Sequence, residues 1–284
     1  MPEGPEVESV RQEILAIIPN KVESIQLTLL SQRYPKYQNQ QSSFNSFKTT
    51  LLIDILRFGK FLVWCFEGTD KVILNHLGMT GRWCLCNDLK HQPDAVTHPK
   101  VIIRLDKPPH LIFDDARNFG QFKIFQTYNE AMKYPPIRSL GIDGLENPFP
   151  IELFIERLNS KRYQDKIIGE LLLNQGLVAG IGNIYKAEAL FQAKIHPLRK
   201  IKTLTNADKK KLGNAISEVL QKALNDLGSS IDTRYILPSG STGNAQLWHK
   251  VYARNAKPCV FCGTEIEKIT QKDRSTFFCP NCQK

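Results

Sequence analysis

Four of the seven cysteines lie close to the C-terminus as two Cys-x2-Cys pairs, with sixteen residues between the pairs. They are Cys259, Cys262, Cys279 and Cys282. Two such pairs supply the four thiolates of a tetrahedral Zn²⁺ site, in which each pair closes one knuckle. A shell of four sulfurs leaves no coordination position open, so we expect one structural Zn²⁺ that stabilises this end of the chain. Basic residues between the pairs favour contact with nucleic acid, and a zinc-dependent protein–protein module is the alternative.

The composition also indicates a polyanionic partner. The chain of 284 residues carries a formal net charge of +10, which is typical of proteins that bind nucleic acid; a surface charged for solubility is the alternative. No apolar run approaches the roughly 20 residues of a membrane helix. The first residues are acidic and polar, unlike a signal peptide. With the clustered cysteines, these features predict a protein that is not secreted but is cytoplasmic, associated with a bacterial-type nucleoid, or organellar.

Hydrophobic periodicity divides the chain into a β-rich part and a helical part. A first helix that ends before Pro19 is followed by short apolar runs separated by turns, which predict a β-sandwich or barrel within residues 1–135. The expected strands are residues 25–29, 51–56, 61–66, 72–74, 101–105 and 111–113. Residues 136–150 are rich in proline and glycine and are expected to form a linker. Beyond it we expect helices at 151–158, 166–173, 186–194 and 206–227, a mobile loop at 228–244 and a hairpin of 264–269 with 275–278.

The first six residues have two interpretations. A small second residue lets Met1 be removed, which leaves the secondary amine of Pro2 as the terminus. An α-amino group titrates near ~8, so part of it is unprotonated at neutral pH and can attack a sugar C1′ to form an imine. Glu3 and Glu6 lie within one helical turn and can supply an acid or a base. The alternative is an ordinary helix start, with proline and acidic residues in the first turn.

Three turns in the β-rich part carry residues suited to DNA contact. Lys60 follows a glycine between two expected strands and is either a phosphate or proton-transfer group or a solvated hairpin lysine. Met79 lies between two glycines in residues 76–81; an exposed apolar tip of this kind can enter a base stack, and packing into the core is the alternative. Arg117 and Phe119 point to one side if their loop is extended, which suits base contact and stacking. An ordinary salt bridge and a core aromatic are the alternative for this pair.

A glycine-rich turn precedes one of the expected helices. Gly180 and Gly182 lie in the segment 176–185, and such a turn at a helix start presents backbone N–H groups to an anion, here a phosphate. A tight turn between two helices is the alternative. Asn183 is expected to cap the helix or to donate to a phosphate.

Taken together, these motifs resemble the formamidopyrimidine-DNA glycosylase family of base-excision repair over nearly the whole chain. The resemblance rests on residues 2–8, Gly59-Lys60, residues 76–81, residues 117–120, residues 180–185 and the terminal cysteines with Arg274 to Phe277. It implies an α+β multi-domain fold with an N-terminal β-sandwich and flanking helices, a helix–two-turn–helix domain and a C-terminal zinc-finger β-hairpin. The implied ranges are a catalytic domain at 1–135, a linker at 136–150, the helical domain with a lesion-capping loop at 151–243 and the zinc finger at 244–284. DNA would lie in a basic cleft.

The resemblance also implies an activity and a role for each site residue. The enzyme would excise oxidised purines (8-oxoguanine and formamidopyrimidines) from duplex DNA and cleave the abasic strand by β,δ-elimination. Pro2 would attack C1′ as a Schiff-base nucleophile, and Glu3 would act as acid and base. Lys60 would assist the β-elimination and Arg274 the second elimination. The implied DNA-binding residues are Glu6, His76, Met79, His98, Arg117, Phe119, Lys161, Asn183 and Tyr185, of which Met79, Arg117 and Phe119 would fill the gap left by the everted base.

The sequence departs from the family pattern at Asn118, Gly169 and Ala245. Gly169 stands where a lysine is expected, so Lys161 or a neighbouring basic residue is expected to supply that phosphate contact. Two other functions compete with this interpretation: excision of oxidised pyrimidines, as in the endonuclease VIII-like branch, and DNA binding by a non-catalytic zinc protein. The expected partner is damaged double-stranded DNA, without membrane contact, and the chain is expected to be a monomer.

Overall fold

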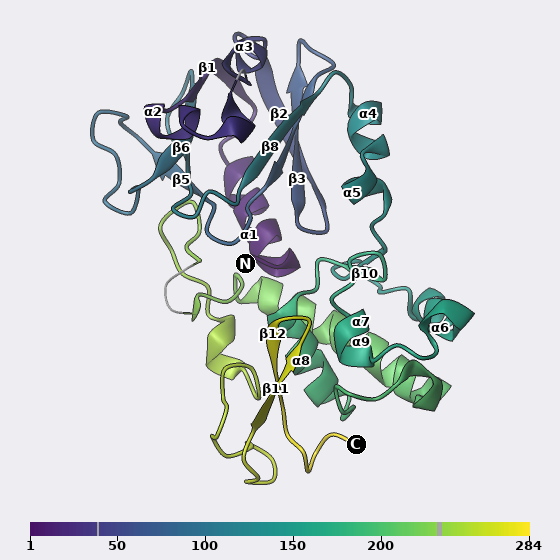
Figure 1. Cartoon of the computed structure of the whole chain (residues 1–284). Helices are drawn as coiled ribbons and strands as arrows, with labels where there is room; N and C mark the ends of the chain where they lie inside the picture. Colours follow the sequence, from purple (N-terminus) through teal and green to yellow (C-terminus); the bar gives the residue numbers. More distant parts are fainter. Residues whose placement is uncertain (39, 232–234) are drawn as a thin grey trace. The chain divides into compact units, whose positions relative to one another are not determined.

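The computed structural model describes residues 1–38, 40–231 and 235–284 (Figure 1). The chain forms two compact units. The first comprises residues 1–2, 6–138 and 227–244, and the second comprises residues 3–5, 139–226 and 245–284. The four domain ranges expected from the sequence stay predictions. Among the described residues, no helix is long and apolar enough to cross a membrane.

The first unit is built on an antiparallel sheet with the strand order β5-β7-β6-β1-β2-β3-β4-β8. Its strands are β1 (Asn20–Leu27), β2 (Leu51–Phe58), β3 (Phe61–Glu67), β4 (Val72–His76), β5 (Arg82–Cys86), β6 (Pro99–Leu105), β7 (His110–Asp114) and β8 (Gln121–Phe125). The sequence predicted neither β5 nor β8. Both are five residues long, too short for alternation alone to distinguish a strand from a turn. The equally short β4 and β7 were predicted only because each contains an unbroken run of large apolar residues, at 72–74 and 111–113.

Strand β1 divides this sheet into two packed halves. Its first two residues pair with β2, and the strand pairs with β6 from Val22 onward, with an irregularity between Val22 and Ser24. The halves meet through large aromatic side chains: the ring centroids of Trp64 and Trp83 are 4.8 Å apart, and those of Phe113 and Phe122 are 4.9 Å apart. These rings are buried. The arrangement confirms the predicted β-sandwich.

Helix α1 (Gly4–Leu15) packs its apolar face against the sandwich core. Val7, Val10 and Ile14 are the buried residues of this face, and their spacing is the helical period seen in the sequence. The unit also contains short helices that the sequence did not predict, because three to six residues are too few to display a period. They are α2 (Leu29–Gln32), the 3-10 turn η1 (Pro35–Tyr37), α3 (Gln40–Asn45), α4 (Tyr128–Lys133) and α5 (Pro135–Arg138).

The second unit is mainly helical. Its elements up to the zinc-finger region are β9 (Ile142–Asp143), α6 (Ile151–Asn159), η2 (Lys161–Tyr163), α7 (Ile168–Leu171), β10 (Val178–Ala179), α8 (Asn183–Gln192), η3 (Ile201–Thr203) and α9 (Asn206–Asn225). Helix α9 begins with a capping box, in which the Thr205 hydroxyl accepts from the Asp208 N–H and the Asp208 carboxylate accepts from the Thr205 N–H. The predicted helix 166–173 is wrong at both ends, because α7 is a single turn.

The C-terminal part of the second unit contains η5 (Ala245–Trp248) and a hairpin of β11 (Glu267–Gln271) and β12 (Arg274–Phe278). The predicted hairpin was placed too early in its first strand. Lys272 and Asp273 both have positive φ, at 47° and 59°, which is the two-residue turn that the twist of a hairpin favours. This turn sets the register in which Gln271 pairs with Arg274.

The segment expected to be a mobile loop, residues 228–244, belongs to the first unit. Its residues 232–234 lie outside the described residues. Ser239 donates through its N–H and its hydroxyl to Glu13, at 2.8 and 2.9 Å. The N–H of Leu85 donates to the carbonyl of Pro238 at 2.8 Å. Residues 238 and 239 of the segment are therefore hydrogen-bonded to β5 and α1.

Candidate functional site

The N-terminal end of helix α8 binds the carboxylate of Glu3. The Gly182 N–H donates to Glu3 Oε2 at 2.8 Å, the Ile184 N–H to Oε1 at 2.9 Å and the Tyr185 N–H to Oε2 at 3.4 Å. A β-carbon on Gly182 would lie 2.4 Å from the Glu3 carboxyl carbon, so glycine is required there. The expectation that this turn holds a phosphate is corrected by these contacts, because a carboxylate of the same chain uses its N–H groups. The partial positive charge of a helix N-terminus stabilises that carboxylate.

This arrangement fixes the residue next to Pro2. Glu3 is buried and Pro2 is half-buried, and the N–H of Gly4 donates to the carbonyl of Gly180 at 2.7 Å. Gly4, which follows Glu3, is therefore held by a backbone hydrogen bond. Pro2, which precedes Glu3, is bonded directly to that fixed residue. A carboxylate fixed by backbone groups, one residue from a proline nitrogen that becomes a secondary amine if Met1 is removed, is suited to acid–base work at a carbon bound to that amine.

Asn183 joins this helix end to the zinc hairpin. Gly182, and not Asn183, is the N-cap residue of α8, so the predicted capping role is wrong. The Asn183 amide instead donates to the carbonyl of Ser275 at 2.7 Å, next to Arg274 at the start of β12. Arg274 is exposed. The ring of Tyr185 is fully buried in the core of the second unit.

Lys186 is a buried cation that sequence reasoning missed. Its side chain is fully buried, and Nζ donates to the Thr276 hydroxyl of β12 at 2.7 Å. Burial lowers the pKa of Lys186 to about 8, opposed by the negative charge of Glu3 and reinforced by the positive charge of Arg274. The available signal was a lysine one turn into a helix whose neighbours are apolar. Lys186 and Asn183 are thus two independent links between α8 and β12.

Gly169 has no room for the lysine expected at its position. A β-carbon there would lie 2.4 Å from Gln271 Oε1 and 2.7 Å from the carbonyl of Pro197. The Gln271 amide donates to that same carbonyl at 3.1 Å. The glycine therefore accommodates the end of β11. Lys161, the expected substitute for the phosphate contact, is exposed in η2.

Lys60 lies in the turn between β2 and β3. It is buried, which contradicts the alternative of a solvated hairpin lysine. Arg57 fixes the turn, because its guanidinium donates to the carbonyl of Gly59 at 2.9 Å and to the carboxylate of Glu8 at 3.0 Å. The pKa of His76 is lowered to about 4 by burial and by the positive charge of Lys60. His76 is therefore neutral at pH 7, and its Nδ1 accepts from the Gly78 N–H at 3.0 Å.

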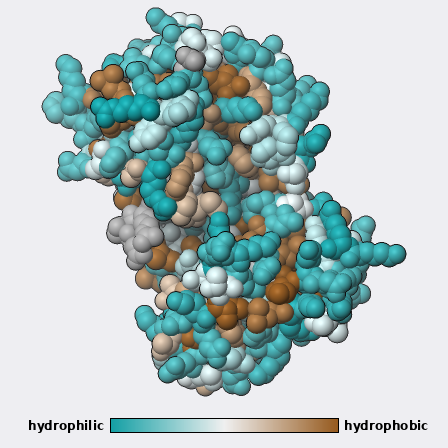
Figure 2. Space-filling model, viewed as in Figure 1, coloured by the Kyte–Doolittle hydropathy of each residue, from teal (hydrophilic) through white to brown (hydrophobic). Residues whose placement is uncertain are grey.

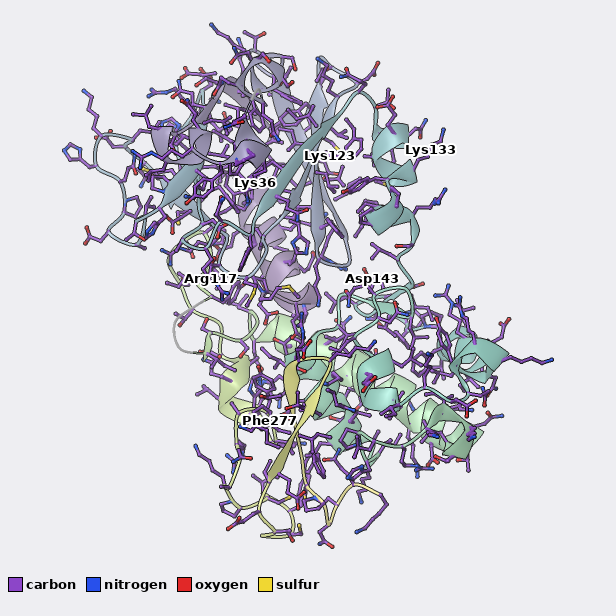
Figure 3. The ribbon with its side chains drawn as sticks, viewed as in Figure 1. Lys36, Arg117, Lys123, Lys133, Asp143 and Phe277 are labelled. Carbon is purple, nitrogen blue, oxygen red and sulfur yellow. The ribbon has the colours of Figure 1, made fainter. Side chains whose placement is uncertain are left out.

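Met79, Arg117 and Phe119 lie on two loops that touch. A β-carbon on Gly78 would lie 2.5 Å from the carbonyl carbon of Phe119, so only glycine permits this approach. Met79 is 42% exposed and Phe119 47% exposed, which excludes the core-filling alternatives for both. The Arg117 guanidinium lies over the Phe119 ring, 4.9 Å from its centroid. Figure 3 labels Arg117 on the first unit.

Hydrogen bonds shape residues 115–120, here named the Phe119 loop. The Asp115 carboxylate accepts from the Gly120 N–H at 2.7 Å and from the Thr80 hydroxyl at 2.6 Å. The Arg117 N–H donates to that hydroxyl at 3.2 Å. Asn118, one of the departures from the family pattern, has a φ of 57°, a conformation that asparagine tolerates better than most residues. The structure thus brings three predicted residues to one apolar and cationic tip.

The two remaining DNA-binding candidates differ in environment. Glu6 is buried, and its Oε1 accepts from the Ser229 N–H at 2.7 Å, so its carboxylate anchors the segment 228–244. His98 is exposed, with Nδ1 2.9 Å from the Thr97 hydroxyl. Figure 2 shows a mostly hydrophilic face interrupted by hydrophobic patches.

The four C-terminal cysteines form a metal site. Their sulfur atoms all lie within 4.8 Å of one another, with Cys259 Sγ 3.8 Å from Cys282 Sγ and Cys262 Sγ 3.5 Å from Cys279 Sγ. Four sulfurs at the Zn–S distance of about 2.3 Å in a tetrahedron are about 3.8 Å apart. The donors therefore fit one Zn²⁺, which confirms the predicted structural cofactor.

Three family models match the chain. The formamidopyrimidine-DNA glycosylase N-terminal domain matches residues 1–122, the formamidopyrimidine-DNA glycosylase H2TH domain matches residues 140–234, and the zinc finger found in FPG and IleRS matches residues 256–284. The formamidopyrimidine-DNA glycosylase of Halalkalibacterium halodurans is 35% identical over 289 residues, with all of both chains covered.

Solved structures of Lactococcus lactis Fpg are also similar. A point mutant of that protein in complex with Fapy-dG-containing DNA has a TM-score of 0.86 and 34% identity, with all of both chains covered. The wild-type protein in complex with DNA containing an oxidized pyrimidine has the same TM-score, identity and coverage.

Proposed function

Because the chain belongs to the formamidopyrimidine-DNA glycosylase family, we propose that it excises 8-oxoguanine and formamidopyrimidines from duplex DNA and cleaves the abasic strand through a Schiff base on Pro2. The coarser activity, that of a DNA glycosylase in DNA repair, follows from the family. The oxidised-purine substrates and the imine mechanism are the proposal. The observation that carries it is the Glu3 carboxylate held by the N–H groups of Gly182, Ile184 and Tyr185, directly after Pro2.

The proposed first step is attack of the unprotonated Pro2 nitrogen on C1′ after removal of Met1. The N–C1′ bond forms, and the bond from C1′ to the base breaks with its electron pair leaving on the base. Glu3 exchanges protons with the sugar and the leaving base, because its fixed position keeps one carboxylate at the reacting carbon. Loss of the amine proton leaves an aminal. Cleavage of the C1′–O4′ bond, with a proton going to O4′, then opens the sugar to a positively charged imine, which makes the C2′ proton acidic.

The second step is strand cleavage. Loss of the C2′ proton expels the 3′ phosphate, and a further elimination expels the 5′ phosphate. Lys60 and Arg274 are the cations proposed to contact these phosphates and to move protons during the two eliminations. When bound, the zinc ion supplies folding energy to the hairpin that carries Arg274. The four sulfur donors leave it no place for substrate.

Access to C1′ requires that the damaged nucleotide leave the duplex, which costs a few kcal/mol. We propose that Met79, Arg117 and Phe119 fill the vacated space. Their exposure and the stacking of Arg117 on Phe119 support this role. The DNA-binding roles of His76, His98, Asn183 and Lys161 are part of the same proposal. Tyr185 contributes through its backbone N–H, because its ring is buried.

Trapping with borohydride tests the nucleophile. A duplex carrying 8-oxoguanine opposite cytosine is mixed with the enzyme and sodium borohydride, which reduces an imine to a stable amine. We expect a covalent protein–DNA adduct with the wild-type chain and none with Pro2→Gly or with a form that retains Met1. A non-catalytic zinc protein gives no adduct with any form. An adduct that persists at full yield when Met1 is retained would overturn the assignment of Pro2.

Oxidised pyrimidines are a second candidate substrate class. The observation in their favour is that the similar Lactococcus lactis protein was crystallised with DNA containing an oxidized pyrimidine. Single-turnover excision of 8-oxoguanine opposite cytosine and of thymine glycol opposite adenine, measured side by side, distinguishes the two classes. We expect the purine to be excised faster.

A further inference from the structure

The side-chain ammonium group of Lys36 donates hydrogen bonds to the backbone on both sides of Phe119. Lys36 is the central residue of η1, and its Nζ donates to the carbonyl of Asn118 at 2.6 Å and also to the carbonyl of Gly120. These two carbonyls immediately precede and follow Phe119 in the chain. Figure 3 labels Lys36 and Arg117 on the first unit. Short-range sequence patterns cannot reveal this contact, because the residues that it joins are 82 and 84 positions apart.

The surroundings of Lys36 act on its charge in both directions. Burial lowers the pKa of Lys36, the carboxylate of Asp115 opposes that shift, and the positive charge of Lys100 adds to it. The ammonium group also lies 4.9 Å from the centroid of the Tyr37 ring, where the face of an aromatic ring attracts a cation. Hydrogen bonds from a charged donor are roughly twice as strong as neutral ones.

The position of Lys36 makes its loss costly for the loop. Lys36 lies on the wall of a hollow of about 360 Å³ together with Phe61, His76 and Gln121. Loss of the ammonium group would therefore take the charged donor from both carbonyls and would widen the hollow beside the Phe119 loop.

We propose that Lys36 is a positioning residue that holds the Phe119 loop rigid so that Phe119 can enter the base stack. The inference rests on the proposed function, in which Phe119 fills the gap left by the everted base. Entry into a stack loads the loop, because unstacking costs a few kcal/mol. If the loop were free to move, the exposed ring of Phe119 would be displaced rather than inserted. Hydrogen bonds from Lys36 to the backbone on each side of the ring instead hold the loop against η1.

The test separates eversion from chemistry. Lys36→Met keeps the length of the stem and removes all three donors, and Lys36→Arg restores a charged donor. Lys48, which is exposed on the same unit, provides the control Lys48→Met. Two single-turnover rates are measured for each variant: release of 8-oxoguanine paired with cytosine, and strand cleavage at a preformed abasic site. The fluorescence of 2-aminopurine placed next to the lesion reports insertion of the ring directly.

Lys36→Met is expected to slow release of the paired lesion by roughly tenfold, the ratio that corresponds to about 1.4 kcal/mol. It should delay the 2-aminopurine signal equally and leave cleavage of the abasic site unchanged. Lys36→Arg should recover most of the loss, and Lys48→Met should match the wild type. Combined with Phe119→Ala, Lys36→Met should add no further loss, because both changes remove the same insertion step.

Three outcomes overturn the proposal: an unchanged rate on the paired lesion, equal losses on both substrates, or losses that add in the double variant. If Phe119→Ala slows the paired lesion and Lys36→Met does not, the inference fails and the proposed function stands. If the wild-type chain neither releases the base nor cleaves the abasic site, the proposed function itself fails. Should Lys36→Met unfold at the assay temperature, Lys36→Gln, which keeps an uncharged N–H donor, is judged by the same criteria.

Discussion

At the scale of single residues, the proposed base release depends most on Glu3. Its two oxygens together accept three backbone N–H groups of α8 and its cap, so the side chain has one orientation. Glu3→Gln keeps the size and replaces one oxygen with a donor that faces N–H groups. We expect base release to fall by roughly 10²–10⁴-fold, the usual contribution of a positioned acid or base. Binding to a duplex with a tetrahydrofuran abasic analogue should survive.

Single-turnover base release and fluorescence anisotropy measure the two quantities for Glu3→Gln. Glu156→Gln, which removes the same charge from an exposed position in α6, is the matched control. Normal turnover by Glu3→Gln would remove this carboxylate from the mechanism. Loss of binding together with a large drop in melting temperature would show that the carboxylate serves the fold of α8.

Lys186 gives a pH prediction with a definite sign. Its pKa is about 8 in the folded chain, against an ordinary value of 10.5. Between these values the unfolded chain binds more protons, so the free energy of unfolding rises with pH across this window. Below pH 8 the buried charge destabilises the fold by roughly 3 kcal/mol.

Lys186→Met should therefore be more stable than the wild type at pH 7, by roughly 1–2 kcal/mol after loss of the Thr276 hydrogen bond. The gain should disappear as the pH rises from 8 to 10.5. Urea unfolding at a series of pH values measures it, with Lys211→Met, at an exposed position of α9, as the control. A parallel pH dependence in both variants would contradict the assigned titration.

At the scale of elements, the sequence predicted what short-range patterns encode. The Cys-x2-Cys pairs identified the zinc site because the ligands of each knuckle are adjacent in the chain, and the helical period identified α1 and α9. The contacts that define the candidate site are long-range. Glu3 and Gly182 are 179 positions apart, so the turn expected to bind a phosphate was recognised as an anion site but assigned the wrong anion. The capping role expected for Asn183 was wrong for the same reason, because its side-chain amide donates to a carbonyl of β12.

The zinc-finger region depends on its metal because its own core is small. The buried apolar cluster that it forms with α8 consists of Ala187, Phe191, Val251, Cys259, Ile266 and Cys279, two of which are metal ligands. A structural zinc contributes about 10–16 kcal/mol in small zinc-binding domains. Without zinc, the four sulfurs are no longer linked and the thiolates among them repel one another, so the β11–β12 hairpin should unfold. Arg274 would then lose its position.

Chelation tests this dependence. We expect the wild-type chain to release one zinc ion per molecule to a colorimetric chelator, with loss of hairpin amide protection in hydrogen exchange. Affinity for duplex DNA should fall in parallel, whereas the amides of the β-sandwich should keep their protection. Cys279→Ser should reproduce the effect, and Cys84→Ser, which alters a cysteine of β5 outside the metal site, should not. A chelated chain with an intact hairpin would refute a folding role for the metal.

At the scale of the whole molecule, the net charge of +10 predicts the form of DNA binding. Cations that neutralise phosphates release counterions, so the logarithm of the affinity falls linearly with the logarithm of salt concentration, by about 0.9 per phosphate contacted. Arg274→Gln should reduce this slope by about 1 and weaken binding to damaged and undamaged duplexes alike.

Phe119→Ala should weaken binding to the damaged duplex without changing the slope, because a stacking ring displaces no counterion. Lys48→Gln serves as the control for general charge. Anisotropy titrations at several salt concentrations give all four slopes, and equal slopes for Arg274→Gln and the wild type would remove Arg274 from the phosphate contacts.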